Sequence, residues 1–177
     1  MRTPGDDEDL VRGFLFNERV IEKIDYIENI ELAGEPVGKY KLKNKAVVTI
    51  NNSENIDIDK IKRNFLTNSS CGVCGKTSLD SLEIIKKDKI VKSFPKIKYE
   101  TIMKSPNMLR QNQSEFSKTG GIHASGLLNT SGEIIAVKED VGRHNALDKL
   151  IGFVLKKELL DNSSQFLTCS GRLNFDL

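Results

Sequence analysis

The sequence predicts a mixed α/β fold with three layers in its second half. Amphipathic helical segments alternate with short runs of β-branched residues, and glycine-containing turns separate the two kinds of segment. From residue 101 onward the order is helix, hairpin, helix, strand and the start of a further helix, which suits helices packed on a sheet. With 177 residues the chain can bury one core and form at most two small domains.

The first 68 residues are expected to form a helix followed by strands. Asp6 to Ile21 has apolar residues near one helical face, and acidic residues fill its first turn, where the helix dipole favours them. Residues 26–32 and 39–50 have the composition of strands, and the second ends in the clearer β-branched run. Residues 57–68 return to helical spacing. We therefore expect an N-terminal helix-and-strand region over residues 1–68.

Residues 69–100 are expected to form a surface region. They begin with a glycine-rich loop that carries Cys71 and Cys74, and they continue as a lysine-rich stretch with interspersed isoleucines. Such a stretch is typical of a solvated surface with one helical segment. No clear interdomain linker separates this region from the residues that follow.

Residues 101–177 carry the three-layer core in this prediction. Ser105 followed by Pro106 is typical of a helix start, and this helix is expected to stop at Gly120 and Gly121. The remaining elements are a hairpin of Ile122–Leu128 and Glu133–Lys138 around Asn129-Thr130-Ser131-Gly132, a helix over Val141–Lys157 and a strand over Gln165–Cys169. The core is expected to be truncated at its C-terminal end, because the sequence stops where a further helix begins.

Composition and charge exclude several classes of protein. Hydrophobic residues make up 38% and charged residues 29%, as in soluble globular proteins. The 27 basic and 25 acidic residues leave a net charge of +2, which gives no reason to expect nucleic acid or a membrane surface as a partner. No apolar run approaches the roughly 20 residues that span a bilayer. Three cysteines suit a reducing compartment better than a disulfide scaffold, so we expect a cytoplasmic protein.

The pair Cys71 and Cys74 can hold a metal, cycle a disulfide or carry a sulfur atom. As a zinc site it supplies two ligands where structural zinc usually has four, and no second ligand pair follows. As a redox pair it lacks the strand-motif-helix frame of thioredoxin. As a sulfur carrier it has small neighbours that leave room for a persulfide, and Lys76 favours the thiolate. Two half-buried structural cysteines remain an alternative, although flanking glycines pack a core poorly.

Gly120 and Gly121 are a candidate for binding an anion. Paired glycines at a helix-to-strand junction expose backbone N–H groups, which suit a phosphate. The alternative, which starts ahead, is that the double glycine only ends a helix.

A second candidate lies in residues 139–149, where a strand is expected to meet a helix start. Arg143, His144 and Asn145 follow one another there, and an arginine supplies a planar fork for phosphate or carboxylate. The alternative is a solvated helix start with ordinary ion pairs. Arg172 repeats the chemistry in a Ser-Gly-Arg turn after the last strand. Two arginines after adjacent strand ends indicate a crevice for a phosphorylated or nucleotide-bearing ligand.

Five motifs occur along the chain in one order. They are Met1-x-Thr3-Pro4-Gly5-Asp6 with Gly13-Phe14-Leu15, then Ser69-Ser70-Cys71-Gly72-Val73-Cys74-Gly75-Lys76, then Gln113-x-x-Phe116 leading into Thr119-Gly120-Gly121-x-His123-Ala124, then Glu139–Gly152, and last Ser170-Gly171-Arg172-x-x-Phe175. In this combination the chain resembles the FdhD family, the formate dehydrogenase accessory sulfurtransferases. The likeness covers nearly the whole chain, and its most specific part is the run from Glu139 to Gly152.

The resemblance implies a sulfur relay. In such proteins a cysteine desulfurase hands a persulfide sulfur to the Cys-x-x-Cys loop. The sulfur then goes to the molybdenum or tungsten of the bis-molybdopterin guanine dinucleotide cofactor that formate dehydrogenase needs. Cys71 is then expected to carry the persulfide, and Cys74 to assist or resolve it. The cofactor pocket, with no metal held by protein side chains, is expected to use Gly120, Gly121, Arg143, His144, Asn145 and Arg172.

The resemblance also implies a cytidine deaminase-like core over residues 101–177. The zinc ligands of that enzyme class are absent from the corresponding places, so no zinc hydroxide is expected. The family pattern continues before Met1 and after the Ser-Gly-Arg turn, so a sheet edge is expected to be exposed, and a homodimer is one way to cover it. Two alternatives stay open, a non-catalytic chaperone that binds the cofactor and a zinc-binding interaction protein.

Overall fold

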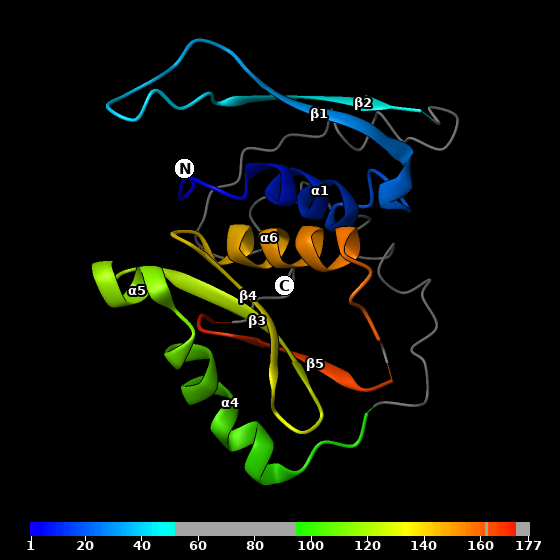
Figure 1. Cartoon of the computed structure of the whole chain (residues 1–177), viewed down its shortest axis with the longest axis vertical. Helices are drawn as coiled ribbons and strands as arrows, with labels where there is room; N and C mark the ends of the chain where they lie inside the picture. Colours follow the sequence, from blue (N-terminus) through cyan, green and yellow to red (C-terminus); the bar gives the residue numbers. More distant parts are fainter. Residues whose placement is uncertain (52–94, 162, 173–177) are drawn as a thin grey trace, which may run out of the picture.

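The computed structural model describes residues 1–51, 95–161 and 163–172 (Figure 1). The chain stacks a two-stranded ribbon, two helices, a three-stranded sheet and a further helix, one upon another. In that order the elements are β1 (Ile27–Ala33) with β2 (Lys45–Ile50), α1 (Asp7–Asn17), α6 (Arg143–Lys156), the sheet of β3 (His123–Asn129), β4 (Ile134–Asp140) and β5 (Gln165–Cys169), and α4 (Tyr99–Gln111). The mixed α/β class is confirmed. The helical spacing predicted over residues 57–68 and the cysteine loop lie outside the described residues.

The sheet has the strand order β4-β3-β5, and both strand pairs are antiparallel. Side chains alternate between its two faces. A Cβ added to Gly126 would lie 2.9 Å from Leu109 of α4, whereas the next residue, Leu127, is buried against Leu150 and Val154 of α6. Helices α4 and α6 therefore cover opposite faces, which is the three-layer arrangement predicted for the second half. The cytidine deaminase-like assignment stays a prediction.

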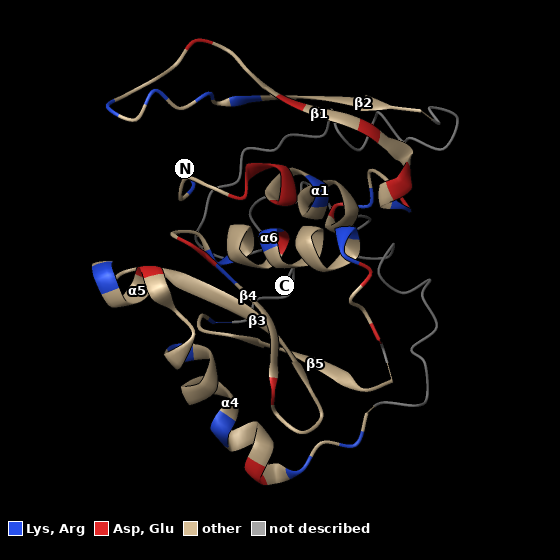
Figure 2. Ribbon diagram, viewed as in Figure 1, with Lys and Arg blue, Asp and Glu red and all other residues tan. Residues whose placement is uncertain are grey.

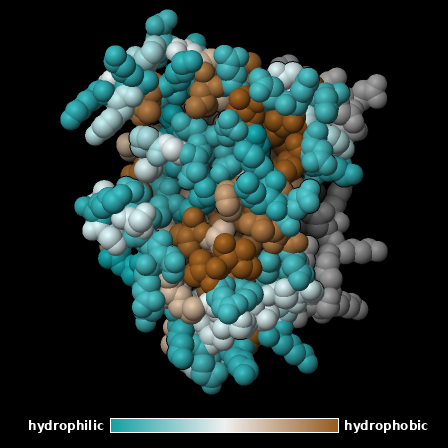
Figure 3. Space-filling model, in the orientation of Figure 1, coloured by the Kyte–Doolittle hydropathy of each residue, from teal (hydrophilic) through white to brown (hydrophobic). Residues whose placement is uncertain are grey.

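The hairpin that joins β3 to β4 is confirmed and is held by its own loop. The side-chain oxygen of Asn129 accepts hydrogen bonds from the backbone N–H groups of Ser131, at 3.1 Å, and Glu133, at 2.9 Å. Gly132 has a φ of +94°, which favours glycine. On the face shown in Figure 3, apolar side chains gather over this hairpin while most of the surrounding surface is hydrophilic. Strand β4 has one partner among the described strands and forms an outer edge of the sheet.

The predicted boundaries of the N-terminal helix were wrong at its end. Helix α1 stops at Asn17, four residues before Ile21, because Arg19 adopts a left-handed conformation with a φ of +54°. Val20 and Ile21 are only 1% exposed, so both are core residues outside the helix. In the sequence these two apolar residues fall where a helix continuing past Asn17 would place its buried face.

Helix α1 crosses α6 at two glycines. A Cβ added to Gly13 would lie 1.8 Å from the carbonyl oxygen of Asp148, and one added to Gly152 would lie 1.9 Å from that of Asp9. No other residue fits there without pushing the helices apart, since protein interiors leave no spare volume. The predicted division at residues 68 and 100 stays a prediction, but this contact packs the first part of the chain against the last.

The helix predicted to start at Ser105 instead starts at Tyr99, so that prediction was wrong. Ser105 and Pro106 lie inside α4, and the Ser105 hydroxyl donates to the carbonyl oxygen of Ile102 at 2.9 Å. That carbonyl would otherwise accept from residue 106, whose proline ring has no N–H to give. The serine therefore compensates for the proline. The helix also breaks after Gln111, and α5 (Ser114–Thr119) is a separate short helix.

Two further boundaries differ from the prediction. Strand β2 begins at Lys45 rather than residue 39, because residues 37–42 form the ribbon's tip through an isolated pairing of Val37 with Leu42. Helix α6 begins at Arg143 rather than at Val141, since β4 continues to Asp140.

A short 3₁₀ helix, Ile24–Tyr26, precedes β1. Figure 2 shows basic residues at one end of the ribbon that β1 and β2 form.

Candidate anion-binding site at the start of helix α6

The first turn of α6 brings together three of the predicted site residues. Gly142 is the N-cap, and Arg143, His144 and Asn145 follow as the first three helical residues. Gly142 is a glycine, so the N-cap residue supplies no side-chain cap to the helix. The N–H groups of a first helical turn have no partner within the helix, and the dipole favours negative charge at this end. The local structure therefore suits an anion.

Arg143 lies beside the turn that follows β5. A Cβ added to Gly171 would lie 3.2 Å from Nδ1 of His123 and 3.4 Å from Cβ of Arg143. Strand β3 begins at His123, so the start of one strand, the end of another and the start of α6 meet here. We call His123, Arg143 and Gly171 the cradle. Arg143 and the Ser-Gly-Arg turn lie close together, but the strands that they follow, β4 and β5, are not adjacent as expected, because β3 lies between them.

The cradle is anchored by the side chain and the backbone of Ser170. Its hydroxyl oxygen accepts from the N–H of Ala124 at 2.8 Å, and its own N–H donates to the carbonyl oxygen of Ala124 at 2.9 Å. These two bonds fix the Ser-Gly-Arg turn to the strand that begins at His123. Arg172 follows as an exposed cation next to the cradle.

The side chain of Arg143 has unused binding capacity. Its Nε–H is buried, and no described residue accepts a hydrogen bond from it. A buried donor without an acceptor costs roughly 1–3 kcal/mol, and an acceptor supplied by a ligand would recover that cost. The cradle is therefore a candidate site for a phosphate or other oxyanion, because an arginine, a glycine without a side chain and a helix start lie together there.

Asn145 is already engaged within the protein. Its amide nitrogen donates to Oδ1 of Asp140 at 3.0 Å and to the carbonyl oxygen of Met1 at 3.0 Å. Both hydrogens of that amide are used, so Asn145 acts as a brace for the helix start. Its predicted part in ligand binding stays a prediction, as does that of the half-buried His144 on the same turn.

Gly120 and Gly121 lie in open space. A Cβ added to either would meet no atom within 4 Å. Gly120 ends α5 in a left-handed conformation with a φ of +70°, and its N–H donates to the carbonyl oxygen of Phe116 at 2.8 Å. This is the helix-stop role that the sequence left open as the alternative. A part for the two glycines in anion binding stays a prediction.

A buried ion pair that was not predicted from the sequence lies beside the site. Asp140 is 0% and Lys149 1% exposed, and their charged atoms lie 2.7 Å apart. The expected alternative to a binding site was a solvated helix start, yet these two charges lie in the interior. A signal was available, because Lys149 follows Ala146 by three residues and so shares its buried helical face.

The two cysteines predicted to carry the chemistry, Cys71 and Cys74, lie outside the described residues. Cys169 is half-buried, and its sulfur lies 3.4 Å from the hydroxyl of Ser125. Within the described ranges no three His, Cys, Asp or Glu side chains gather as metal ligands would. No helix in the part of the chain that the structure describes is long and apolar enough to cross a membrane.

Fold and site together define a mixed α/β protein with a candidate anion-binding cradle at a helix start. The model of the FdhD/NarQ family matches residues 1–177. The chain therefore belongs to the FdhD/NarQ family, which confirms the resemblance found in the sequence.

Curated relatives support the same membership. The chain is 40% identical over 177 residues to sulfur carrier protein FdhD of Saccharolobus solfataricus, covering all of this chain and 62% of the relative. It is 41% identical over 178 residues to the protein of that name from Picrophilus torridus and 40% identical over 181 residues to that from Streptomyces avermitilis. The chain spans 63% and 64% of those two relatives.

A solved structure has the same fold. The crystal structure of a putative formate dehydrogenase accessory protein from Desulfotalea psychrophila superposes with a TM-score of 0.64 at 24% sequence identity. The match covers 99% of this chain and 60% of that one. The likeness supports the mixed α/β arrangement described above.

Proposed function

We propose that this chain is a sulfur carrier that serves the maturation of formate dehydrogenase. The observation that carries the proposal is the family match over residues 1–177, which includes the cysteine run. The curated relatives at about 40% identity are each named sulfur carrier protein FdhD. The proposed donor is a cysteine desulfurase, and the proposed client is formate dehydrogenase.

Loading of sulfur is a transfer between thiols. The Cys71 thiolate attacks the terminal sulfur of the donor's persulfide, the sulfur–sulfur bond of the donor breaks, and the donor leaves as a thiolate. A new sulfur–sulfur bond forms on Cys71, so the step needs no external oxidant or reductant. Cys74 assists or resolves the persulfide. The chain therefore works as a sulfurtransferase.

The proposed acceptor is the bis-molybdopterin guanine dinucleotide cofactor, as a substrate. Its phosphates are the oxyanions that the cradle suits, and Arg143 with the neighbouring Arg172 supplies the positive charge. The buried, unpaired Nε–H of Arg143 supports this assignment. His144 lies on the same helical turn and is kept in the proposed pocket.

Sulfur loading is tested with the protein, a cysteine desulfurase and cysteine. Mass spectrometry should find a gain of about 32 Da, one sulfur atom, on the peptide that contains Cys71. Cys71→Ala should abolish the gain, and Cys74→Ala should lower it or change its lifetime. Cys169→Ala is the matched control, because the third cysteine is half-buried in the sheet. If the Cys71→Ala and Cys74→Ala proteins still load as much sulfur as the wild type, the relay is refuted. Nucleotide binding without loading would favour the cofactor-binding chaperone.

The acceptor pocket is tested by calorimetry with guanosine diphosphate. Arg143→Ala should weaken binding about 10- to 100-fold, since a hydrogen bond to a charged group contributes roughly 1.5–3 kcal/mol. Arg12→Ala is the control, because Arg12 pairs with Glu8 on α1 and has no contact with the cradle. Equal affinity of the Arg143→Ala and wild-type proteins would remove the cradle from the pocket.

A further inference from the structure

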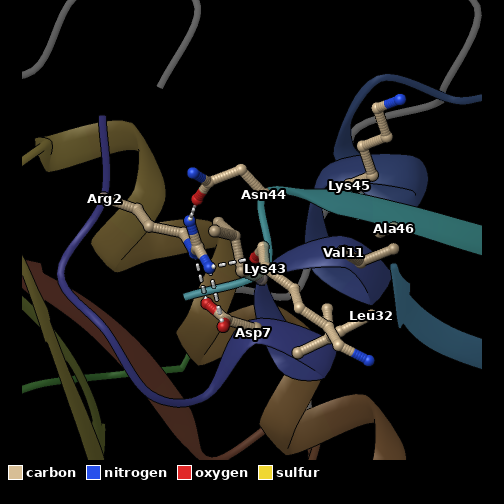
Figure 4. A pocket seen from close by; sticks show the side chains of 9 residues that line it. Arg2, Asp7, Val11, Leu32, Lys43, Asn44, Lys45 and Ala46 are labelled. Atoms are coloured by element: carbon tan, nitrogen blue, oxygen red, sulfur yellow. Dashed lines mark hydrogen bonds and ion pairs between the residues drawn. The ribbon is translucent and has the colours of Figure 1, made fainter. Parts of the chain in front are cut away.

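Besides the hydrogen bond that the carbonyl oxygen of Met1 accepts from Asn145, residues 1–3, the N-terminal strap, are fastened to the molecule at two points. The first is Arg2, whose guanidinium donates to the carboxylate of Asp7, to Oδ1 of Asn44 at 2.8 Å and to the carbonyl oxygen of Lys43 at 3.0 Å. Figure 4 shows this guanidinium between the start of α1 and the residues that lead into β2, at the edge of a shallow pocket. One side chain thereby ties the strap to both α1 and the ribbon.

The second point is Thr3, which uses three of its groups on the junction between β4 and α6. Its N–H donates to Oδ2 of Asp140 at 2.9 Å, and its carbonyl oxygen accepts from the ammonium of Lys149 at 2.9 Å. Its hydroxyl oxygen accepts from the N–H of Val141 at 2.9 Å. All three bonds join residues more than 130 positions apart in the sequence.

These bonds reach the cradle through Asp140. While Oδ2 is held by Thr3 and Lys149, Oδ1 accepts from the N–H of Gly142 at 2.9 Å and from the amide of Asn145 at 3.0 Å. Gly142 is the N-cap that immediately precedes Arg143. The carboxylate is thus fixed through both oxygens, and its orientation sets the backbone from which Arg143 projects.

We propose that Thr3, held in place by Arg2, is a positioning residue for Arg143, so that the ribbon, α1 and the anion-binding cradle are coupled through the strap. As far as the ligand is concerned, the inference rests on the proposed function. Met1 is exposed, so the strap adds little apolar burial. Its contribution consists of polar contacts directed at one helix start, and a shift of about 1 Å in a binding group can cost as much as 100-fold in function.

The test uses matched variants of the whole chain. Thr3→Val keeps the β-branched shape and removes the hydroxyl acceptor, whereas Thr3→Ser keeps the hydroxyl. Arg2→Ala frees the other end of the strap, and Arg12→Ala removes an arginine of α1 that does not contact it. Should Arg2→Ala fail to fold, Thr3→Val, which changes no charge, still tests the proposal.

The first readout needs no ligand. In protein labelled with ¹⁵N-arginine, the buried Nε–H of Arg143, assigned with Arg143→Lys, should exchange slowly with water. Thr3→Val and Arg2→Ala should speed this exchange by about threefold or more, the effect of losing one hydrogen bond, while Thr3→Ser and Arg12→Ala should not. Unchanged exchange in Thr3→Val, together with a lower midpoint of urea unfolding, would overturn the proposal and leave the strap a purely stabilising element.

The second readout is the affinity for guanosine diphosphate. It should fall in Thr3→Val and Arg2→Ala and stay unchanged in Thr3→Ser and Arg12→Ala. Faster exchange in Thr3→Val with weaker nucleotide binding supports the coupling of strap and pocket. Faster exchange in a protein whose wild type binds no nucleotide supports the positioning of Arg143 and refutes the assigned pocket. Unchanged affinity in Thr3→Val beside a wild type that binds overturns the functional coupling.

Discussion

The two sides of the α6 start use charge in opposite ways. On one side Asp140 and Lys149 are almost completely buried, and both oxygens of the carboxylate have protein partners. On the other side Cβ of Arg143 lies beside Gly171, and the buried Nε–H of this arginine has no partner among the described residues. Buried polar groups in proteins are nearly always paired, so the side with the unpaired donor is the candidate binding side. The paired side stabilises the junction between β4 and α6.

The largest expected effect comes from breaking the paired side. Lys149→Met leaves the Asp140 carboxylate buried without its cation, so the free energy of unfolding should fall by about 3–5 kcal/mol. Urea unfolding at neutral pH measures this loss. Lys118→Met is the control, because the ion pair of Lys118 with Glu115 is exposed and should matter little. A Lys149→Met protein as stable as the wild type would show that Asp140 and Lys149 do not form a buried ion pair.

A smaller effect is expected at Asp148, an acid of the same helix that has no cation partner among its described contacts. Burial raises the pKa of Asp148 to about 7, and the nearby charges of Glu18 and Asp140 act in the same direction. A hydrogen bond from Asn17, at 2.7 Å, opposes the shift. The unfolded chain loses this proton near pH 3.8. Stability should therefore fall as the pH rises from about 4 to about 7, and level off above that.

Asp148→Asn should remove this pH dependence. The gain in the free energy of unfolding should reach roughly 2–4 kcal/mol at pH 8 and vanish near pH 3.5. Asp161→Asn is the control with the opposite sign, because hydrogen bonds from Ser163 and Ser164 lower the pKa of Asp161 to about 2. Its carboxylate stabilises the fold above pH 4, and that contribution is lost as the pH falls towards 2. Parallel pH profiles for wild type and Asp148→Asn would contradict the assignment.

Local chemistry explains which parts of the fold the sequence predicted. The hairpin turns on Asn129, whose side chain makes the loop's own hydrogen bonds, so the turn is encoded within five residues. Two of the helix boundaries that failed, the end of α1 and the start of α4, depend on distant packing or on a substitute hydrogen bond. Val20 and Ile21 are buried outside a helix, and Ser105 supplies the hydrogen bond that Pro106 lacks. Periodicity and capping rules detect neither effect.

The site shows the same limit. The closeness of Arg143 to the Ser-Gly-Arg turn was predictable, because both follow ends of strands in one sheet. The burial of Asp140 was not, since its partner Thr3 lies 137 positions away and no local pattern links them. The position of Lys149 on a buried helical face was the one available sign.

The smallest expected effect distinguishes the cradle from the double glycine as the place where an anion binds. Gly171→Ala puts a methyl group 3.2 Å from His123 and 3.4 Å from Arg143, a tight fit that narrows the cradle. Gly171 is not among the described residues with positive φ, so the backbone accepts alanine and stability should change by no more than about 1 kcal/mol. Affinity for guanosine diphosphate should nevertheless fall about threefold to tenfold, because one charge-assisted hydrogen bond is displaced.

Gly121→Ala is the matched control, because its methyl group would meet no atom within 4 Å. If the cradle binds the phosphate, Gly121→Ala should bind guanosine diphosphate as the wild type does. The reverse outcome, a loss with Gly121→Ala and none with Gly171→Ala, would move the binding site to the exposed N–H groups after α5. The unpaired Nε–H of Arg143 would then need another explanation. The two sides of the α6 start would no longer differ as a structural side and a ligand-binding side.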